Sequence, residues 1–105
     1  MNIVSGLPSA DTSAEPLIVK NTITLNTSWT DAGNDIYTKS ITISGSTANS
    51  KIDLQFTASQ IQQLLSDGVN AMYVDNDNNS LTVYAVGAAP TAAMTIQCTL
   101  TEVTS

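Results

Sequence analysis

The chain of 105 residues contains no histidine and no arginine, and it has three lysines against nine acidic residues. Without histidine, the most common general base is missing, and Ser–His–Asp or Cys–His arrangements are excluded. The net charge of −6 disfavours nucleic acid, which binds to basic patches, and it also disfavours anionic membrane surfaces. Neither a glycine-rich phosphate loop nor a zinc-type Cys/His spacing occurs. We therefore expect a protein that is not an enzyme, holds no cofactor, and binds neither nucleic acid nor membrane.

Cysteine is almost absent as well, since Cys98 is the single one. One cysteine cannot form an internal disulfide, so the fold does not depend on an oxidising compartment. Cys98 has the same parity in its segment as Met94, Ile96 and Leu100, which indicates a small buried hydrophobic residue. The first sixteen residues lack the cationic start and apolar centre of a signal peptide, and no apolar run approaches the ~20 residues of a membrane span.

The residues that are abundant favour β-structure, because Thr, Ile and Val suit a pleated, half-buried surface. Alternation of apolar and polar residues predicts strands within 17–26, 36–44, 51–56, 71–74, 80–86 and 94–103. Strands with one polar and one apolar face are typical of antiparallel sheets. The sequence therefore predicts a mainly β protein, an antiparallel two-layer β-sandwich of about six strands with one short helix at about 58–67.

The helix has start and stop signals of its own. Ile61, Leu64 and Leu65 form an apolar stripe at helical spacing. Thr57 with Gln60 three residues later forms a capping-box pattern, and Gly68 is placed to end the helix in a left-handed conformation. Residues 17–105 are thus expected to form a single domain, and residues 1–16, rich in Ser, Ala and Pro, a flexible arm or linker.

The segment "DNDNN" (75–79) has two interpretations. Asp75, Asp77 and Asn79 alternate as at the start of a calcium loop. However, Ser80 stands where such a loop needs glycine, and Val86 where it needs an acidic residue. Asp and Asn are also favoured in hairpin turns. The pattern favours a turn, and a metal site remains the alternative.

Trp29 and Tyr37 flank the polar segment "TDAGND" (30–35). As core residues they would hold the two ends of a loop by which the chain crosses from one sheet to the other. As ligand contacts they would form an aromatic platform for a sugar. Aromatic residues make up only 5% of the chain, so few are left for a sugar groove, and the core interpretation is favoured.

The chain contains more apolar residues than the core of one small sandwich needs. Tyr84 and Val86 have the parity opposite to the apolar face of strand 80–86, and Ile36 has the parity opposite to the apolar face of strand 36–44. Soluble monomers rarely expose large apolar patches. The arm carries Ile3, Val4 and Leu7, for which a neighbouring subunit is a natural host. These residues predict a homo-oligomer.

The order Trp29, a short polar loop, Tyr37-Thr38, "ITISG", "STANSKIDL", a helix and "LTVYAVGAAPTAAMTIQCTLTEV" resembles a module of tailed-bacteriophage virion proteins. This module is the distal β-sandwich domain of fibre, tail or head-decoration proteins, and the resemblance covers residues 22–103. It implies a structural role in the virion, often as a homotrimer, beside other phage structural proteins and with host surface glycans as further contacts at the loop tips. It implies assembly in the bacterial cytoplasm and carries no catalytic residues.

The alternative function is a carbohydrate- or cell-surface-binding module of an adhesin that uses the 30–35 loop beside Trp29. Two features distinguish these functions. A sugar site needs exposed aromatic rings, which are few in this chain, and a virion component is expected to be oligomeric in solution.

Overall fold

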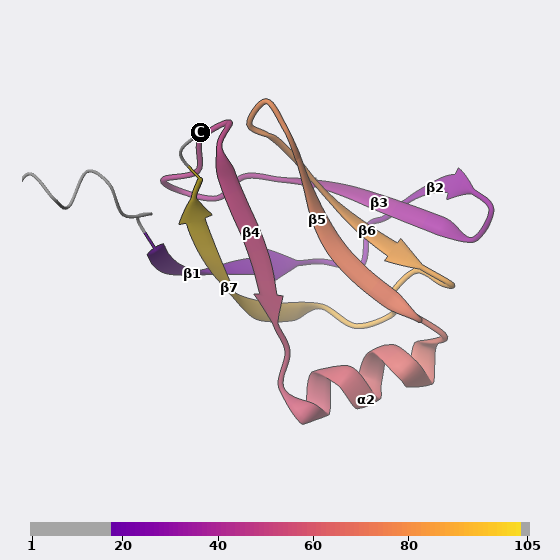
Figure 1. Ribbon diagram of the computed structural model, residues 1–105. Coiled ribbons are helices and arrows are strands. Elements are labelled where there is room, and N and C mark those ends of the chain that lie inside the picture. The colour runs from indigo at the N-terminus through magenta and orange to yellow at the C-terminus, as the bar shows by residue number, and fades with distance from the viewer. Residues whose placement is uncertain (1–17, 104–105) are drawn as a thin grey trace, which may run out of the picture.

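In the computed structural model, which describes residues 18–103, the chain forms two antiparallel sheets packed face to face, with a helix at one end (Figure 1). The three-stranded sheet has the order β1 (Ile18–Leu25), β7 (Met94–Glu102), β4 (Ser50–Gln55). The four-stranded sheet has the order β2 (Thr30–Gly33), β3 (Ile36–Ile41), β6 (Ser80–Val86), β5 (Ala71–Asp77). The predicted antiparallel two-layer sandwich is confirmed.

The prediction of about six strands missed β2, which lies in the segment expected to be a crossing loop. β2 pairs with β3 in the same sheet, so residues 30–35 form a hairpin and the interpretation as a crossing loop was wrong. Gly33, Asn34 and Asp35 all have positive φ angles, which close the tight turn. The chain changes sheets earlier, between the end of β1 and the start of β2, at residues 26–29. β2 escaped prediction because a short, exposed edge strand has no buried face and therefore no alternation.

The hairpin of β5 and β6 is tighter than predicted. Its turn is Asn78 and Asn79, with φ angles of 53° and 70°, and β5 continues to Asp77. Two left-handed residues suit a two-residue hairpin turn, and Asn tolerates this conformation. The turn sets the register of the pair, which places Asp77 opposite Ser80 and Tyr73 opposite Tyr84.

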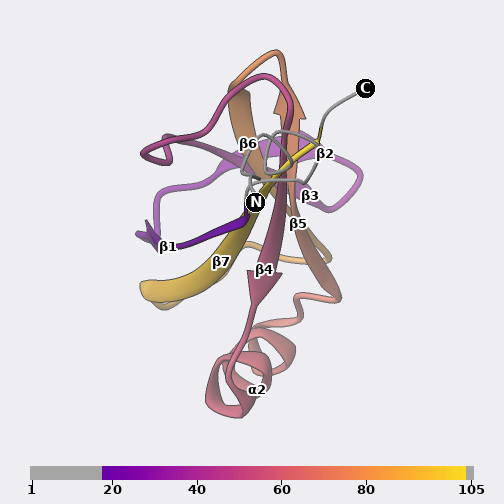
Figure 2. The same cartoon turned by 60° about the vertical axis from the view of Figure 1, so that its left-hand side comes forward.

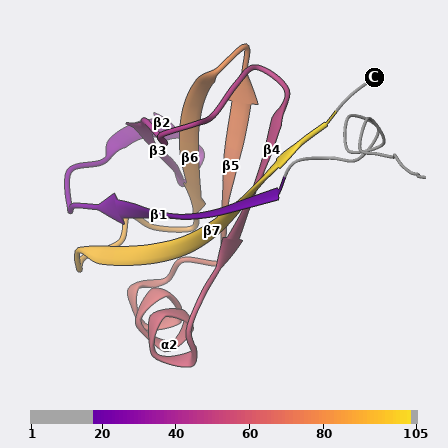
Figure 3. The ribbon, with the colours of Figure 1, turned by 90° about the vertical axis from the view of Figure 1, so that its left-hand side faces the viewer.

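The core lies between the two sheets and is built from the inward parity of each strand. In Figure 3, β1 and β7 cross β5 and β6 at a steep angle, as in orthogonal packing of sheets. Alternate residues of β7 (Ile96, Cys98 and Leu100) are buried, which confirms the parity predicted for that strand. The other buried members of this cluster are Ile23, Leu25, Ile43, Ile52, Leu81 and Val83.

The helix α2 (Ala58–Asp67) links β4 of one sheet to β5 of the other and closes one end of the sandwich (Figure 2). Both halves of the predicted capping box are present between Thr57 and Gln60, and Gly68 ends the helix with φ 91°. Leu64 is buried in a second cluster with Val69 and Ala85. Within residues 18–103, no helix is long and apolar enough to cross a membrane.

The opposite end of the sandwich is joined by side chains that bind the segment between β3 and β4. The Oγ1 of Thr47 donates to both carboxylate oxygens of Glu102 in β7, at 2.8 and 2.7 Å. The Nδ2 of Asn76 in β5 donates to the carbonyl oxygens of Thr47 and Ser50. Both sheets are therefore hydrogen-bonded to the segment around Thr47, and these bonds fix the two layers relative to each other at this end.

Candidate functional site

The predicted contact residues are divided between the two faces of the four-stranded sheet. Tyr37 points inward and packs half-buried against the cluster of Leu64, Val69 and Ala85. Tyr84 and Val86 have the opposite parity and point outward, since Leu81, Val83 and Ala85 are the buried residues of β6. The structure does not bring Tyr37 together with Tyr84 and Val86. Ile3, Val4 and Leu7 lie outside the described residues.

Trp29 lies in the connection between the sheets and packs, half-buried, against both core clusters. The Nζ of Lys39 lies 5.5 Å from the centroid of its ring and also donates to the Oδ1 of Asn26. The Nε1 of Trp29 is buried without a hydrogen-bond partner in the part of the chain that the structure describes. A ring that is packed on the core and covered by a lysine offers little open area to a sugar, so this arrangement favours the core interpretation.

The outer face of the four-stranded sheet carries an aromatic pair. Tyr73 of β5 and Tyr84 of β6 stand opposite each other, with ring centroids 5.1 Å apart and ring planes 7° from parallel. The next row of the same face contains Ala71, Val86 and Ile36. Tyr73 is 51% exposed. We call the patch of Ile36, Tyr73, Tyr84 and Val86 the tyrosine face.

Tyr73 was missed as a surface residue by the sequence analysis, although the signal was present. If Asn78 and Asn79 are taken as a two-residue turn, the register alone places Tyr73 opposite Tyr84. The sequence analysis treated all of 75–79 as the turn, and a five-residue turn does not set the register that places Tyr73 opposite Tyr84. Ile36, by contrast, is on the outer face together with Val86, as its parity predicted.

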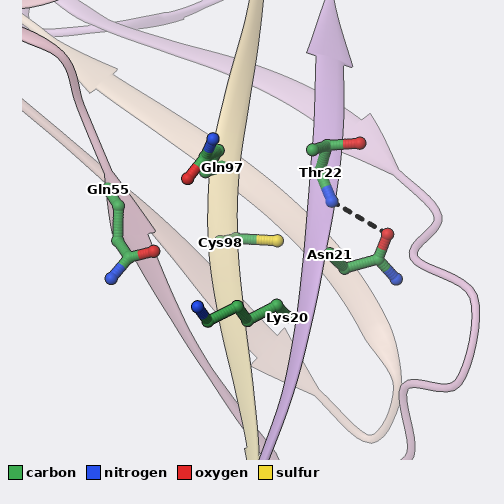
Figure 4. Close-up of a pocket in the computed structure, with 6 residues that line it drawn as sticks. All are labelled: Lys20, Asn21, Thr22, Gln55, Gln97 and Cys98. Carbon is green, nitrogen blue, oxygen red and sulfur yellow. Dashed lines mark hydrogen bonds between the residues drawn. The ribbon is translucent and has the colours of Figure 1, made fainter.

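The outer face of the three-stranded sheet has a polar hollow with a volume of about 470 Å³. Beyond this hollow the same face carries one exposed apolar residue, Ile18 of β1, opposite Thr101. Thr22, Gln97 and Gln55 form one row across its three strands. Figure 4 shows Lys20 reaching from β1 across β7 toward Gln55. This trough offers amides, hydroxyls and one ammonium group, which can donate and accept hydrogen bonds but provide no general base.

Cys98 also borders the trough, but its side chain is buried. Burial raises the pKa of the Cys98 thiol, because the charged thiolate is poorly solvated there. The thiol therefore stays protonated at neutral pH and is a weak nucleophile. Cys98 is confirmed as a buried residue, and the trough has no activated thiol.

The residues of the alternative metal site occupy two elements. Asp75 and Asp77 are exposed on β5, and Asn79 is in the turn, where its Oδ1 accepts a hydrogen bond from the Oγ of Ser46. Across residues 18–103, no three His, Cys, Asp or Glu side chains gather to hold a metal ion. The calcium alternative stays a prediction.

An apolar groove runs between α2 and the start of β5. Its volume is about 160 Å³, and its main apolar lining residues are Phe56, Ile61, Leu64, Leu65, Val69 and Met72. Of the predicted helical stripe, Leu64 is buried, whereas Ile61 is 45% and Leu65 is 62% exposed. The stripe thus faces the core with one residue and the solvent with two.

No family model, curated protein or solved structure matches the chain. The surfaces described above therefore carry the functional argument. They comprise the tyrosine face, a polar trough and an apolar groove, whose chemistry suits binding.

Proposed function

We propose that the chain is a non-enzymatic structural component of a bacteriophage virion, of the head-fibre, decoration or tail-fibre type, that assembles as an oligomer. The observation that supports assembly is the exposed tyrosine face. The resemblance of residues 22–103 to phage modules carries the virion part and favours three copies.

The two outer faces of the sandwich differ in a way that supports assembly. On the three-stranded sheet the outward residues of β7 are Thr95, Gln97, Thr99 and Thr101, as expected for a face in water. On the four-stranded sheet the corresponding face carries Tyr73, Tyr84, Ile36 and Val86. Soluble monomers rarely expose large contiguous apolar patches, and such patches mark protein contacts. Aromatic residues are enriched in the centres of such contacts.

A second function, a carbohydrate-binding module of a cell-surface adhesin, is favoured by one observation. Asp75 lies on the same outward face as Tyr73 and Tyr84, in the neighbouring row. Sugar sites combine aromatic rings with a few polar groups that fix orientation. In this alternative, host glycan would bind at the tyrosine face rather than beside Trp29.

Light scattering on the full chain, over a wide range of concentrations, tests the proposal. We expect a mass that is a multiple of 11.0 kDa and that falls in the variants Tyr73→Ser and Tyr84→Ser. The control is Gln97→Ser, which makes a comparable truncation on the outer face of the other sheet. A mass of 11.0 kDa at every concentration would overturn assembly, and glycan binding lost in Tyr73→Ser would then favour the adhesin function.

A further inference from the structure

We propose that the apolar groove between α2 and β5 is a two-fold contact between copies of this chain. The inference rests on the proposed assembly function and adds a contact separate from the tyrosine face. Its occupant is the α2 surface of a second copy.

The first support is the shape of the surface. Ile61 and Leu65 lie one helical turn apart and therefore stand side by side on the helix. Ile61 is 45% and Leu65 is 62% exposed, and both line the groove together with Phe56 and Met72. The same patch thus contains a protruding apolar ridge and a hollow next to it.

A patch of this kind can be complementary to itself. In a two-fold contact both copies use the same surface. A ridge residue of the first copy therefore enters the groove of the second, and the same ridge residue of the second copy enters the groove of the first. Leu65, which is more exposed than Ile61, would enter the groove of the partner copy. The exposed Asn70, which also lines the groove, would form part of the uncharged rim that surrounds the apolar centre of an interface.

The second support is the distribution of charge. Between Phe56 and Met72 the only ionisable residue is Asp67. Its carboxylate accepts hydrogen bonds from the backbone N–H and the Oγ1 of Thr91 and from the Nε2 of Gln63, on the side of the helix away from Leu65.

A chain with a net charge of −6 repels its own copies, and this repulsion is smallest in a contact whose facing surfaces carry no charged groups. The tyrosine face, in contrast, has Asp75 and Asp77 on the same side of β5. A second copy can therefore dock at the groove in a two-fold contact without like charges facing each other there.

The test is the mass of the full-length variant Leu65→Lys in solution. Losing a two-fold contact halves the mass of an assembly, so we expect half of the wild-type mass. Lysine keeps the helix propensity of leucine, and the substituted side chain is mostly exposed, so circular dichroism should show an unchanged fold. The control is Ser66→Lys, which adds the same charge on the same helix but turned away from the groove and should leave the mass unchanged.

A second variant, Ile61→Gln, removes the other ridge residue without adding charge and should weaken the same contact. Wild-type mass in both Leu65→Lys and Ile61→Gln, combined with a lower mass in Tyr84→Ser, would overturn the groove contact and leave the proposed assembly standing. A wild-type protein that stays at 11.0 kDa would overturn both.

Discussion

The side chain of Asn76 donates a hydrogen bond of 2.8 Å from its Nδ2 to the carbonyl oxygen of Ser50, and so links the edge strand β5 of one sheet to the edge strand β4 of the other. The same amide nitrogen donates to the carbonyl oxygen of Thr47 at 2.9 Å, and the Asn76 Oδ1 accepts from the backbone N–H of Asn79. One side chain therefore serves three backbone groups at the end of the sandwich opposite the helix.

We expect Asn76→Ala to lower the free energy of unfolding by about 1–2 kcal/mol, because the part-buried carbonyl oxygen of Ser50 loses its partner, while water can replace Asn76 at the two exposed groups. Urea unfolding measures this loss. Gln62→Ala, which truncates an exposed amide on α2, is the control and should stay within about 0.5 kcal/mol of wild type. Equal effects of the two substitutions would show that the Asn76 bonds add nothing to stability.

Trp29 packs on both core clusters, so its truncation should weaken the whole sandwich. We expect Trp29→Ala to lower the free energy of unfolding by about 3 kcal/mol, at the low end for a large aromatic residue because the ring is half-buried. Trp29→Phe should lose less than half as much, because it keeps most of the apolar contact and removes a buried N–H that has no partner among the described residues. Thermal melting of both variants checks this order, and a phenylalanine variant as unstable as the alanine variant would contradict it.

Two glycines with left-handed conformations should respond differently to alanine. At Gly87, which has φ 109°, a Cβ atom would collide with the carbonyl oxygen of Gly68 and lie 2.8 Å from the Nδ2 of Asn70. At Gly45, which has φ 87°, a Cβ would meet no atom within 4 Å. Gly45→Ala therefore carries only the conformational cost of about 1–2 kcal/mol, and Gly87→Ala about 3–5 kcal/mol. Chemical unfolding of the two variants measures the difference, and similar losses would show that the backbone near Gly68 yields easily.

Asp67 should make stability depend on pH on the acid side. Its pKa is lowered, first by the hydrogen bond from the Thr91 backbone N–H, then by the Thr91 hydroxyl, with a smaller contribution from Gln63. A carboxyl whose pKa is lower in the folded state stabilises the fold above its unfolded pKa, and this contribution is lost as the pH falls through the folded value, below about pH 4.

Asp67→Asn should therefore be less stable than wild type at pH 7, and the difference should shrink at pH 3. Urea unfolding at both pH values tests this, with the exposed Asp75→Asn as the control substitution. A difference between Asp67→Asn and wild type that is the same at pH 7 and pH 3 would argue that the carboxylate charge is not responsible.

Much of the fold could be predicted because its signals are local. The capping box of Thr57 and Gln60 and the left-handed Gly68 act within one helical turn, so they can be recognised from neighbouring residues. The alternation in β7 follows from one buried and one wet face, and the buried residues Ile96, Cys98 and Leu100 match it. β2 could not be predicted in the same way, because all four of its residues are exposed and nothing in its pattern differs from a loop.

The surfaces were only partly predictable. The parity of Tyr84, Val86 and Ile36 predicted that they point away from the core, and the structure places them there. Tyr73 joined them only through the register of the Asn78–Asn79 hairpin. The apolar stripe of α2 predicted a helix but not its contacts, because how much of Ile61 and Leu65 is covered depends on where the two sheets lie.

The sequence by itself determined the helix, six of the seven strands of the described chain and the apolar side of most of these strands, because apolar residues recur at the positions that face the core. Only the tertiary structure decided that β1 and β4 both pair with β7, one on each side of it. These features depend on contacts between residues far apart in the chain, such as Ile18 opposite Thr101. No local pattern specifies such a partner, because many strands of the same period could fill the same place.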